Sequence, residues 1–589
     1  MAISESAALA IVYVALAICA LVACAAARVV YSELKGGGGG GKDAEAGGDA
    51  VPKGTDYWYS ARRSQGWVSL GLSFFASSMG AWVLFAAPEV GILSGWWGNL
   101  GYALASTVPL GAVAILGPAV LSRFGEGFCL TDWVRVRFGR GMQIYVGIIS
   151  LFYMWIYLVA ELSSMGNLIF SMAGLDPLHA LLPVSIATML YTSLAGLPAS
   201  IWTDRLQGVV MVVTILVTLI ACFTKLNVGA TEWRSVSTWT DKGFESLVTL
   251  IIAVLGAGLF DMSAWQRVYA ASGAATLRKG CAFGVALIFP TMILFGLAGM
   301  LAQAQALTST GAGVAIPALG FFELLGMQSS GFSGLAFALA VCMVASSVDS
   351  LQTGLLSVLS REILSKKLSP TQSLLAGQLF LVAVNMPAII MATEGTKDPD
   401  FGGSIINLFL IADLLAVSIA VPVFMGLGSL ATQGGALAGC VSGLLFILGF
   451  GWFEFHTFMA GLEMVTLMAF GNVKPKEVGL GASRTCIIFF VLPFVTGAVT
   501  YVASWAERVA AMMTPRLGTA GARAPAPPQE AVKARAAVQA MEAVQAPEAV
   551  KEPEVVKEPE PEAVEAPEAA QAPEAVEEPE AAKPPKMAL

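Results

Sequence analysis

The most informative part of the sequence is GFSGLAFALAVCMVASSVDSLQTGLLSVLSREI, residues 331–363. It is an apolar run long enough to cross a bilayer as a helix, and Ser346, Ser347, Asp349 and Ser350 lie near its middle. A buried aspartate there costs about 2.5–3.5 kcal/mol on insertion scales unless it faces protein, water or an ion. We therefore expect this helix to line an ion pathway. The alternative, serines that bond to their own helix and pack against neighbours, explains one serine better than the whole cluster.

The composition predicts a protein that crosses the membrane many times. Of the 589 residues, 56% are hydrophobic and only 13% are charged, and the mean hydropathy is +0.73, whereas a soluble domain carries about 25% charged residues. The net charge of −8 says little about partners, because much of the acid lies in a polar tail after residue 515. No broad basic face for nucleic acid is predicted. Eight irregularly spaced cysteines and two histidines fit neither a disulfide framework nor a zinc site.

Apolar runs of about 20 residues predict thirteen membrane-spanning helices. The runs lie near residues 6–31, 66–92, 95–120, 142–172, 179–196, 200–223, 246–267, 280–304, 331–359, 372–394, 402–426, 434–455 and 485–506. The first run follows Glu5 and precedes Arg28 and Lys35, the reverse of a signal peptide, so we expect a retained helix with its N-terminus outside. Cleavage after the small residues 25–27 is the alternative.

This orientation places the excess of Lys and Arg in the cytoplasmic loops, as the positive-inside rule requires. An odd number of spans then leaves the C-terminus in the cytoplasm, and the plasma membrane is the expected location. Residues 36–41 are six glycines, which predict a flexible cytoplasmic loop over residues 32–65. The tail, residues 507–589, repeats Ala, Pro, Glu and Val, so we expect it to be disordered and to offer a contact for a cytoplasmic protein partner.

Two of the runs are expected to be broken near the membrane centre. Residues 72–91, LSFFASSMGAWVLFAAPEVG, hold small residues around Gly80, and residues 254–267, VLGAGLFDMSAWQR, hold two glycines and the intramembrane Asp261. The second break lies five spans after the first, as an inverted repeat predicts, and transporters bind substrates where helices unwind. Unwound carbonyls and the serines of residues 331–363 could together ligate a small hard cation, for which sodium is the natural candidate. Close helix packing is the alternative role for these small residues.

Three motifs resemble signature regions of the sodium/solute symporter family, which includes sodium-coupled proline, sugar and urea carriers. They are ASSMGAW (residues 76–82), YTSLAGLPASIWTDRLQG (residues 191–208) and SSVDSLQTGLLSVLSREI (residues 346–363), and the resemblance covers about residues 55–506.

The resemblance implies an all-α fold with the inverted five-plus-five helix repeat also found in sodium-coupled amino-acid symporters. The repeats would form a transport core over residues 66–426, with one extra helix at residues 1–31 before it and two helices at residues 427–506 after it. The first repeat would cover about residues 66–223 and the second about residues 246–426.

The resemblance also implies a sodium site and an exit path. The ligands would be the backbone carbonyls of Ala76, Met79 and Met343 and the hydroxyls of Ser346 and Ser347. Asp204 would help sodium to leave toward the cytoplasm; its alternative is a helix-capping or Arg-paired aspartate at the interface. Asp349 would hold a second cation or pair with a neighbour.

The substrate is predicted only by class. Gly80 and Trp82 occupy positions where proline and sugar carriers present polar groups to the substrate. This difference argues against a sugar as the substrate. FDMSAWQRVYAA, residues 260–271, is similar to urea and polyamine symporters, in which an acid faces the substrate. Asp261 could accept hydrogen bonds from a urea-like NH2 group or pair with a cationic amine. The first break, however, lacks the tryptophan-rich sequence of the urea carriers.

We therefore expect a sodium-coupled symporter that imports a small polar solute by alternating access, with urea or a polyamine favoured. The alternatives are an amino acid such as proline, another small organic solute, or a transporter-like nutrient sensor that signals through its tail. An enzyme is not expected, because no nucleophile, base and orienting group recur together and no catalytic residue is predicted.

Overall fold

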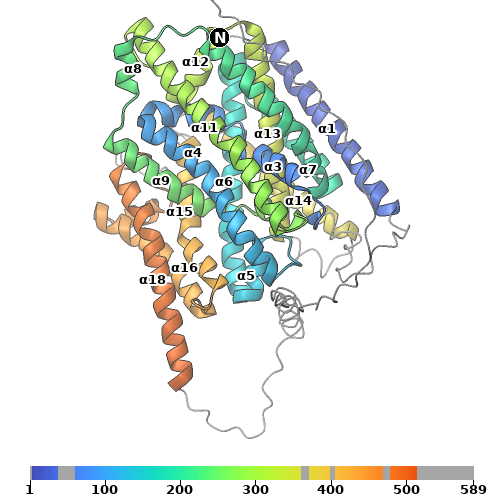
Figure 1. The fold of residues 1–589 in the computed structure, drawn as a ribbon, viewed down its shortest axis with the longest axis vertical. Coiled ribbons are helices and arrows are strands. Elements are labelled where there is room, and N and C mark those ends of the chain that lie inside the picture. Colours follow the sequence, from blue (N-terminus) through green and yellow to red (C-terminus); the bar gives the residue numbers. More distant parts are fainter. Residues whose placement is uncertain (1–2, 37–59, 360–369, 398–404, 468–477, 514–589) are drawn as a thin grey trace, which may run out of the picture. The chain divides into compact units, whose positions relative to one another are not determined.

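A computed structural model describes residues 3–36, 60–359, 370–397, 405–467 and 478–513, which fold into helices joined by short connections (Figure 1). The helices are α1 (Glu5–Gly36), α3 (Trp67–Ser78), α4 (Val83–Arg123), α5 (Leu130–Phe138), α6 (Arg140–Ala173), α7 (Leu178–Phe223), α8 (Ala230–Val236), α9 (Asp241–Gly258), α10 (Met262–Ala270), α11 (Ala274–Thr310), α12 (Gly320–Gly326), α13 (Ser330–Leu359), α14 (Pro370–Lys397), α15 (Ile405–Phe424), α16 (Gln433–Phe455), α17 (Phe458–Met464) and α18 (Ser483–Met513), with 3-10 turns η1 (Pro317–Leu319) and η3 (Met425–Leu427). Helix α18 continues to Met513, so residues 507–513, the first part of the predicted disordered tail, are helical. The rest of that tail and most of the glycine-rich loop lie outside the described residues.

The described helices account for the predicted membrane spans. Ten of them are long and apolar enough to cross a membrane, and the bent pair α9–α10 raises the number to eleven. Two helices turn sharply at a glycine with positive φ, Gly95 in α4 (φ 56°) and Gly196 in α7 (φ 60°), a conformation that costs glycine little. When α4 and α7 are divided at these glycines, eleven of the thirteen predicted runs each correspond to one described helical segment, and the runs 66–92 and 246–267 each correspond to two, α3 with the start of α4 and α9 with α10. The chain is a multi-pass integral membrane protein.

Short helices outside these spans were not predicted. The segments α5, α8, α12 and α17 have 9, 7, 7 and 7 residues, too few for an apolar run that could cross the bilayer. In addition, α1 continues to Gly36, five residues beyond its predicted end at residue 31.

The first predicted break lies between α3 and α4. α3 ends at Ser78, Met79 leaves the helical conformation (φ −97°, ψ 74°), and α4 begins at Val83. Across the gap the amide of Val83 donates to the carbonyl of Gly80 at 3.1 Å, so the chain makes a tight turn before it resumes as a helix. The regular ladder of main-chain hydrogen bonds is therefore interrupted inside a membrane span, as the sequence predicts.

The second break separates α9 from α10, whose axes are bent by 58°. Asp261 caps the N-terminus of α10, because one carboxylate oxygen, Oδ1, accepts a hydrogen bond from the amide of Ser263 at 2.9 Å. An N-terminal aspartate cap satisfies an amide that the helix leaves unpaired. The interruption predicted from the glycines of residues 254–267 is thus fixed by the aspartate that follows them.

Helix α13 contacts both broken spans, through α3 and α10. It contacts α7, α6, α1, α10 and α3, and its side chains are buried from Met343 to Ser357. Large apolar side chains elsewhere remain exposed, among them Ile115, Leu190 and Ile220, as expected for surfaces that face lipid tails. The polar residues of α13 therefore face other helices rather than lipid.

Candidate ion and substrate site

The five predicted sodium ligands lie on the end of α3 and on α13, two helices in contact. Ala76, Met79, Met343, Ser346 and Ser347 are all fully or almost fully buried. The hydroxyl of Ser347 donates to the carbonyl of Met343 at 3.0 Å, one turn earlier on its own helix, so two of the predicted ligand oxygens are already close together. An oxygen-rich set of this kind, with no thiol or imidazole, suits a hard cation.

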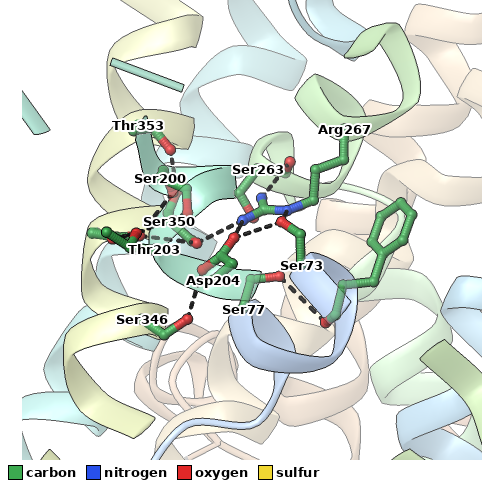
Figure 2. Close-up of polar contacts among 12 residues, drawn as sticks. Ser73, Ser77, Ser200, Thr203, Asp204, Ser263, Arg267, Ser346, Ser350 and Thr353 are labelled. Carbon is green, nitrogen blue, oxygen red and sulfur yellow. Dashed lines mark hydrogen bonds and ion pairs between the residues drawn. The ribbon is translucent and has the colours of Figure 1, made fainter. Parts of the chain in front are cut away.

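Asp204 on α7 forms a buried ion pair close to these ligands (Figure 2). Its Oδ2 accepts from Nη2 of Arg267 at 2.7 Å and from the hydroxyl of Ser73 at 2.5 Å, and its Oδ1 accepts from the hydroxyl of Ser346 at 2.7 Å. Both charged side chains are fully buried. The alternative of an Arg-paired aspartate is thus present, fully buried among the helices, and Asp204 also contacts a predicted sodium ligand.

Arg267 ties four helices into one network, as Figure 2 shows. Its Nε donates to Ser73 on α3 at 2.7 Å, its Nη1 to the carbonyl of Ser263 on α10 at 2.9 Å, and its Nη2 to Ser350 on α13 at 2.7 Å as well as to Asp204 on α7. Sequence reasoning gave Arg267 no role. The WQR sequence just after the second break was its only signal.

Asp349 pairs with neighbouring hydroxyls. Its Oδ1 accepts from Ser200 on α7 at 2.9 Å and from Ser350 at 3.2 Å, and its Oδ2 accepts from Thr203 at 3.4 Å. The carboxylate also interacts electrostatically with Asp204. Two fully buried acids therefore share this region with one guanidinium group, which leaves it with an excess of acceptor oxygens along the predicted ion path.

An aromatic cluster lies on the other side of the first break. Trp82 packs against Tyr102, Tyr157 and Phe409, with ring centroids 5.6, 6.5 and 5.4 Å apart. Tyr157 also contacts Phe409 at 5.2 Å and Tyr153 at 6.1 Å. The Trp82 indole donates to the Tyr157 hydroxyl at 2.9 Å. Trp82, one of the predicted substrate contacts, is thus part of a wall of rings that we call the aromatic cage: Trp82, Tyr102, Tyr153, Tyr157 and Phe409.

Acidic side chains lie near the aromatic cage: Glu89 acts electrostatically on Tyr102, Glu161 acts on Tyr157, and Asp261 and Asp413 act on a third ring. Asp261 is partly buried, Asp413 on α15 is almost fully buried, and both interact electrostatically with Tyr153. Asp261 also acts on Tyr157, and Asp413 acts on Tyr102. Among the described residues, no side chain donates a hydrogen bond to Asp413. Sequence reasoning predicted Asp261 and missed Asp413, whose signal was a single acid within the apolar run of residues 405–424.

Gly80, the remaining predicted substrate contact, faces a carboxylate. A side chain at this position would overlap Glu161 of α6, and one oxygen of Glu161 accepts from the amide of Ala81 at 3.1 Å. Sequence reasoning did not single out Glu161, which lies in the middle of an otherwise apolar helix.

Comparisons with known proteins agree with this architecture. The model of the sodium:solute symporter family matches residues 58–443. The chain is similar to the spermidine transporter DUR31 of Candida albicans, with 26% identity over 466 residues, 77% of this chain and 84% of that protein. It is also similar to the sodium/glucose cotransporter of Vibrio parahaemolyticus, with 24% identity over 387 residues, 58% of this chain and 68% of that protein.

Among solved structures, the chain is similar to a Na+-coupled sialic acid symporter in a substrate-bound outward-open state. The TM-score is 0.64 at 15% sequence identity, and the match covers 85% of this chain and 97% of that one. At this identity the likeness concerns the fold. It supports the inverted-repeat arrangement expected from the two broken helices.

Proposed function

This chain belongs to the sodium:solute symporter family, and we propose that it couples sodium entry to the import of a polyamine or a similar multiply charged amine. Sodium-coupled symport follows from the family and from sodium-coupled relatives. The proteins that it resembles are transporters, so the chain is not an enzyme. The substrate and the residues that bind it are the proposed part.

The observation that carries the substrate proposal is the pair of acids at the aromatic cage. Asp413 lies one helical turn after Phe409 of the cage on α15 and so shares its face, Asp261 caps α10 at the second break, and both act electrostatically on Tyr153. Aromatic faces attract ammonium groups, and hydrogen bonds from an ammonium to a carboxylate are among the stronger ones in proteins. Two acids spaced along a cage suit an amine with two or more charges better than a neutral sugar.

The expected substrate was urea or a polyamine, and the relatives support a polyamine and not urea. The Candida albicans protein, matched over most of both chains, is a spermidine transporter, and the relatives described above give no support to urea transport. In the described part of the chain, no side chain donates a hydrogen bond to Asp413. A cationic substrate would supply this missing partner.

For the ion, we propose the site formed by the carbonyls of Ala76, Met79 and Met343 and the hydroxyls of Ser346 and Ser347. The contact between Ser346 and Asp204 supports an exit path in which the departing sodium meets Asp204 and then the acceptor-rich region around Asp349. We also propose a plasma-membrane location with the N-terminus outside and the C-terminus in the cytoplasm, where the tail would meet any protein partner.

Import of a cation together with sodium has an energetic consequence. Each positive charge that moves inward gains about 2.3 kcal/mol per 100 mV of membrane potential. A sodium ion and a doubly charged amine would therefore gain about three times this amount before any concentration gradient is counted. Transport should be strongly driven by an inside-negative potential.

The test is uptake of radiolabelled spermidine into proteoliposomes that contain the purified protein. We expect uptake to require an inward sodium gradient, and 1,4-diaminobutane to compete better than urea, proline or glucose. Competition by proline or urea instead of the diamine would replace the substrate class. Spermidine uptake at the same rate with and without the sodium gradient would contradict the proposal that this chain is a sodium-coupled polyamine carrier.

A further inference from the structure

Glu161 is a fully buried acid that nothing above assigns to a role. It lies on α6, and one of its oxygens, Oε2, accepts a hydrogen bond from the amide of Ala81 at 3.1 Å. The other, Oε1, is buried and has no hydrogen-bond partner in the part of the chain that the structure describes. The carboxylate therefore offers a free acceptor inside the membrane.

The free oxygen points at the first broken helix. A Cβ at Gly80 would overlap Oε1 of Glu161, so the turn between α3 and α4 leaves space for this carboxylate. On the other side, the hydroxyl of Ser347 on α13 donates to the carbonyl of Met343 on its own helix and lies close enough to act electrostatically on Glu161. Glu161 thus lies between the unwound backbone after Met79 and one of the hydroxyls proposed to bind sodium.

No basic side chain is seen to neutralise Glu161 within the described ranges. Arg267, the buried guanidinium of this region, donates to Ser73, Asp204, Ser263 and Ser350. Burying an ionised carboxylate without a counter-charge costs several kcal/mol. A cation held beside Oε1 would supply the missing charge.

We propose that Glu161 is a carboxylate ligand of the coupling sodium ion. The inference rests on the sodium site proposed above and adds a charged ligand to its neutral carbonyls and hydroxyls. Carboxylate and carbonyl oxygens are the ligands that hard cations take. With Glu161, the positive charge of the bound sodium is balanced inside the membrane.

This ligand would also connect the ion to the substrate. Tyr157, a member of the aromatic cage, lies one helical turn before Glu161 on α6 and so shares its face, and the two side chains interact electrostatically. The same carboxylate holds the amide of Ala81, next to Trp82. Sodium bound at Glu161 would therefore fix the two aromatic residues, Trp82 and Tyr157, that are joined by a hydrogen bond.

The experiment measures sodium binding without transport. Purified full-length protein is heated in sodium or in choline chloride, and the sodium concentration that gives half of the stabilisation is read for the wild type and each variant. Glu161→Gln keeps the size of the side chain and removes its charge, and we expect it to raise this concentration about tenfold or more. Glu161→Asp, which restores a carboxylate, should recover part of the response.

Glu89→Gln is the matched control. Glu89 is a nearly buried acid of α4 that also has an oxygen without a partner, but it is not among the groups that interact with Ser347 or with the turn at Gly80. We expect this variant to keep the sodium response of the wild type. Melting in choline shows whether each variant is folded.

The outcomes separate the two proposals. A normal sodium response in Glu161→Gln, together with a lost response in the Ser346→Ala/Ser347→Ala double variant, would overturn the role of Glu161 and leave the serine site in place. A wild-type protein that sodium does not stabilise, and that takes up spermidine without it, would contradict the proposed function itself. Equal loss in Glu89→Gln and Glu161→Gln would also overturn the inference, because any buried acid would then have the same effect.

Discussion

The two acid clusters of this protein differ in whether the protein itself satisfies them. Around Asp204, the guanidinium of Arg267 and the hydroxyls of Ser73 and Ser346 meet the carboxylate. At Glu161 and Asp413, buried carboxylates lie beside broken backbone and aromatic rings without a basic partner among the described residues. A buried carboxylate with a basic partner holds helices together, whereas a buried carboxylate without one is a candidate site for a cationic ligand. Buried acids without a basic partner are therefore the better guide to where cationic ligands bind.

The largest effect should come from breaking the satisfied cluster. Arg267→Met leaves Asp204 buried without its counter-charge, which costs about 3–5 kcal/mol when one partner of a buried pair is removed. We expect a large fall in the thermal midpoint of the purified protein and a loss of uptake. Adding Asp204→Asn removes the stranded charge, so the double variant should melt at a higher temperature than Arg267→Met alone. A double variant no more stable than the single one would mean that the pair is not coupled.

The acids at the aromatic cage should respond in the opposite way. Asp413→Asn removes a charge without stranding a partner, so we expect little loss of stability and about a tenfold or larger rise in the spermidine concentration needed for half-maximal uptake. Asp261→Asn should raise the half-maximal spermidine concentration by a similar factor. Because an asparagine still caps α10, we expect this variant to lose little stability. Preserved sodium stabilisation in both variants is the control. Unchanged spermidine affinity in both would remove the cage from the substrate site.

The serines of α13 should have a smaller effect, seen chiefly in the sodium dependence. Ser346→Ala and Ser347→Ala each remove one hydroxyl, and one hydrogen-bonding group contributes about 0.5–1.5 kcal/mol. We expect each to raise the half-maximal sodium concentration several-fold, with little change in surface expression. Ser350→Ala, which removes a partner of Arg267, should change sodium dependence less. Sodium dependence that stays the same in the double variant would exclude this site.

The smallest effect should come from an ion pair at the surface. Lys397 contacts Asp176 at 2.9 Å, but both side chains are well exposed, at 44% and 39%. The hydrogen bond from Lys397 holds the pKa of Asp176 below its ordinary value, so its contribution is present above about pH 4 and is lost as the pH falls through the lowered pKa. Lys397→Met should leave melting between pH 6 and pH 8 unchanged. A loss like that in Arg267→Met would show that burial does not decide the strength of these pairs.

The sequence was informative about features that depend on local pattern. Apolar runs predicted the spans, glycines predicted both breaks, and three motifs predicted the family. Run boundaries were also predicted close to Gly95 and Gly196, but the positive φ of these glycines, and the helix that continues directly past each, needed the structure. The partners of the acids could not be predicted either, since Glu161 meets Gly80 and Arg267 meets Asp204 only after distant helices pack. A single acid in an apolar run indicates a functional position without indicating what it faces.

The most direct measurement is a crossed titration of the two unsatisfied acids. Sodium and spermidine are each titrated alone, with thermal stabilisation as the readout, against the wild type, Glu161→Gln and Asp413→Asn. We predict that Glu161→Gln lowers the affinity for sodium about tenfold or more and leaves the affinity for spermidine nearly unchanged. We predict that Asp413→Asn lowers the affinity for spermidine and leaves the affinity for sodium nearly unchanged. Two variants that weakened both ligands equally, or neither, would contradict the claim that each free carboxylate belongs to its own ligand.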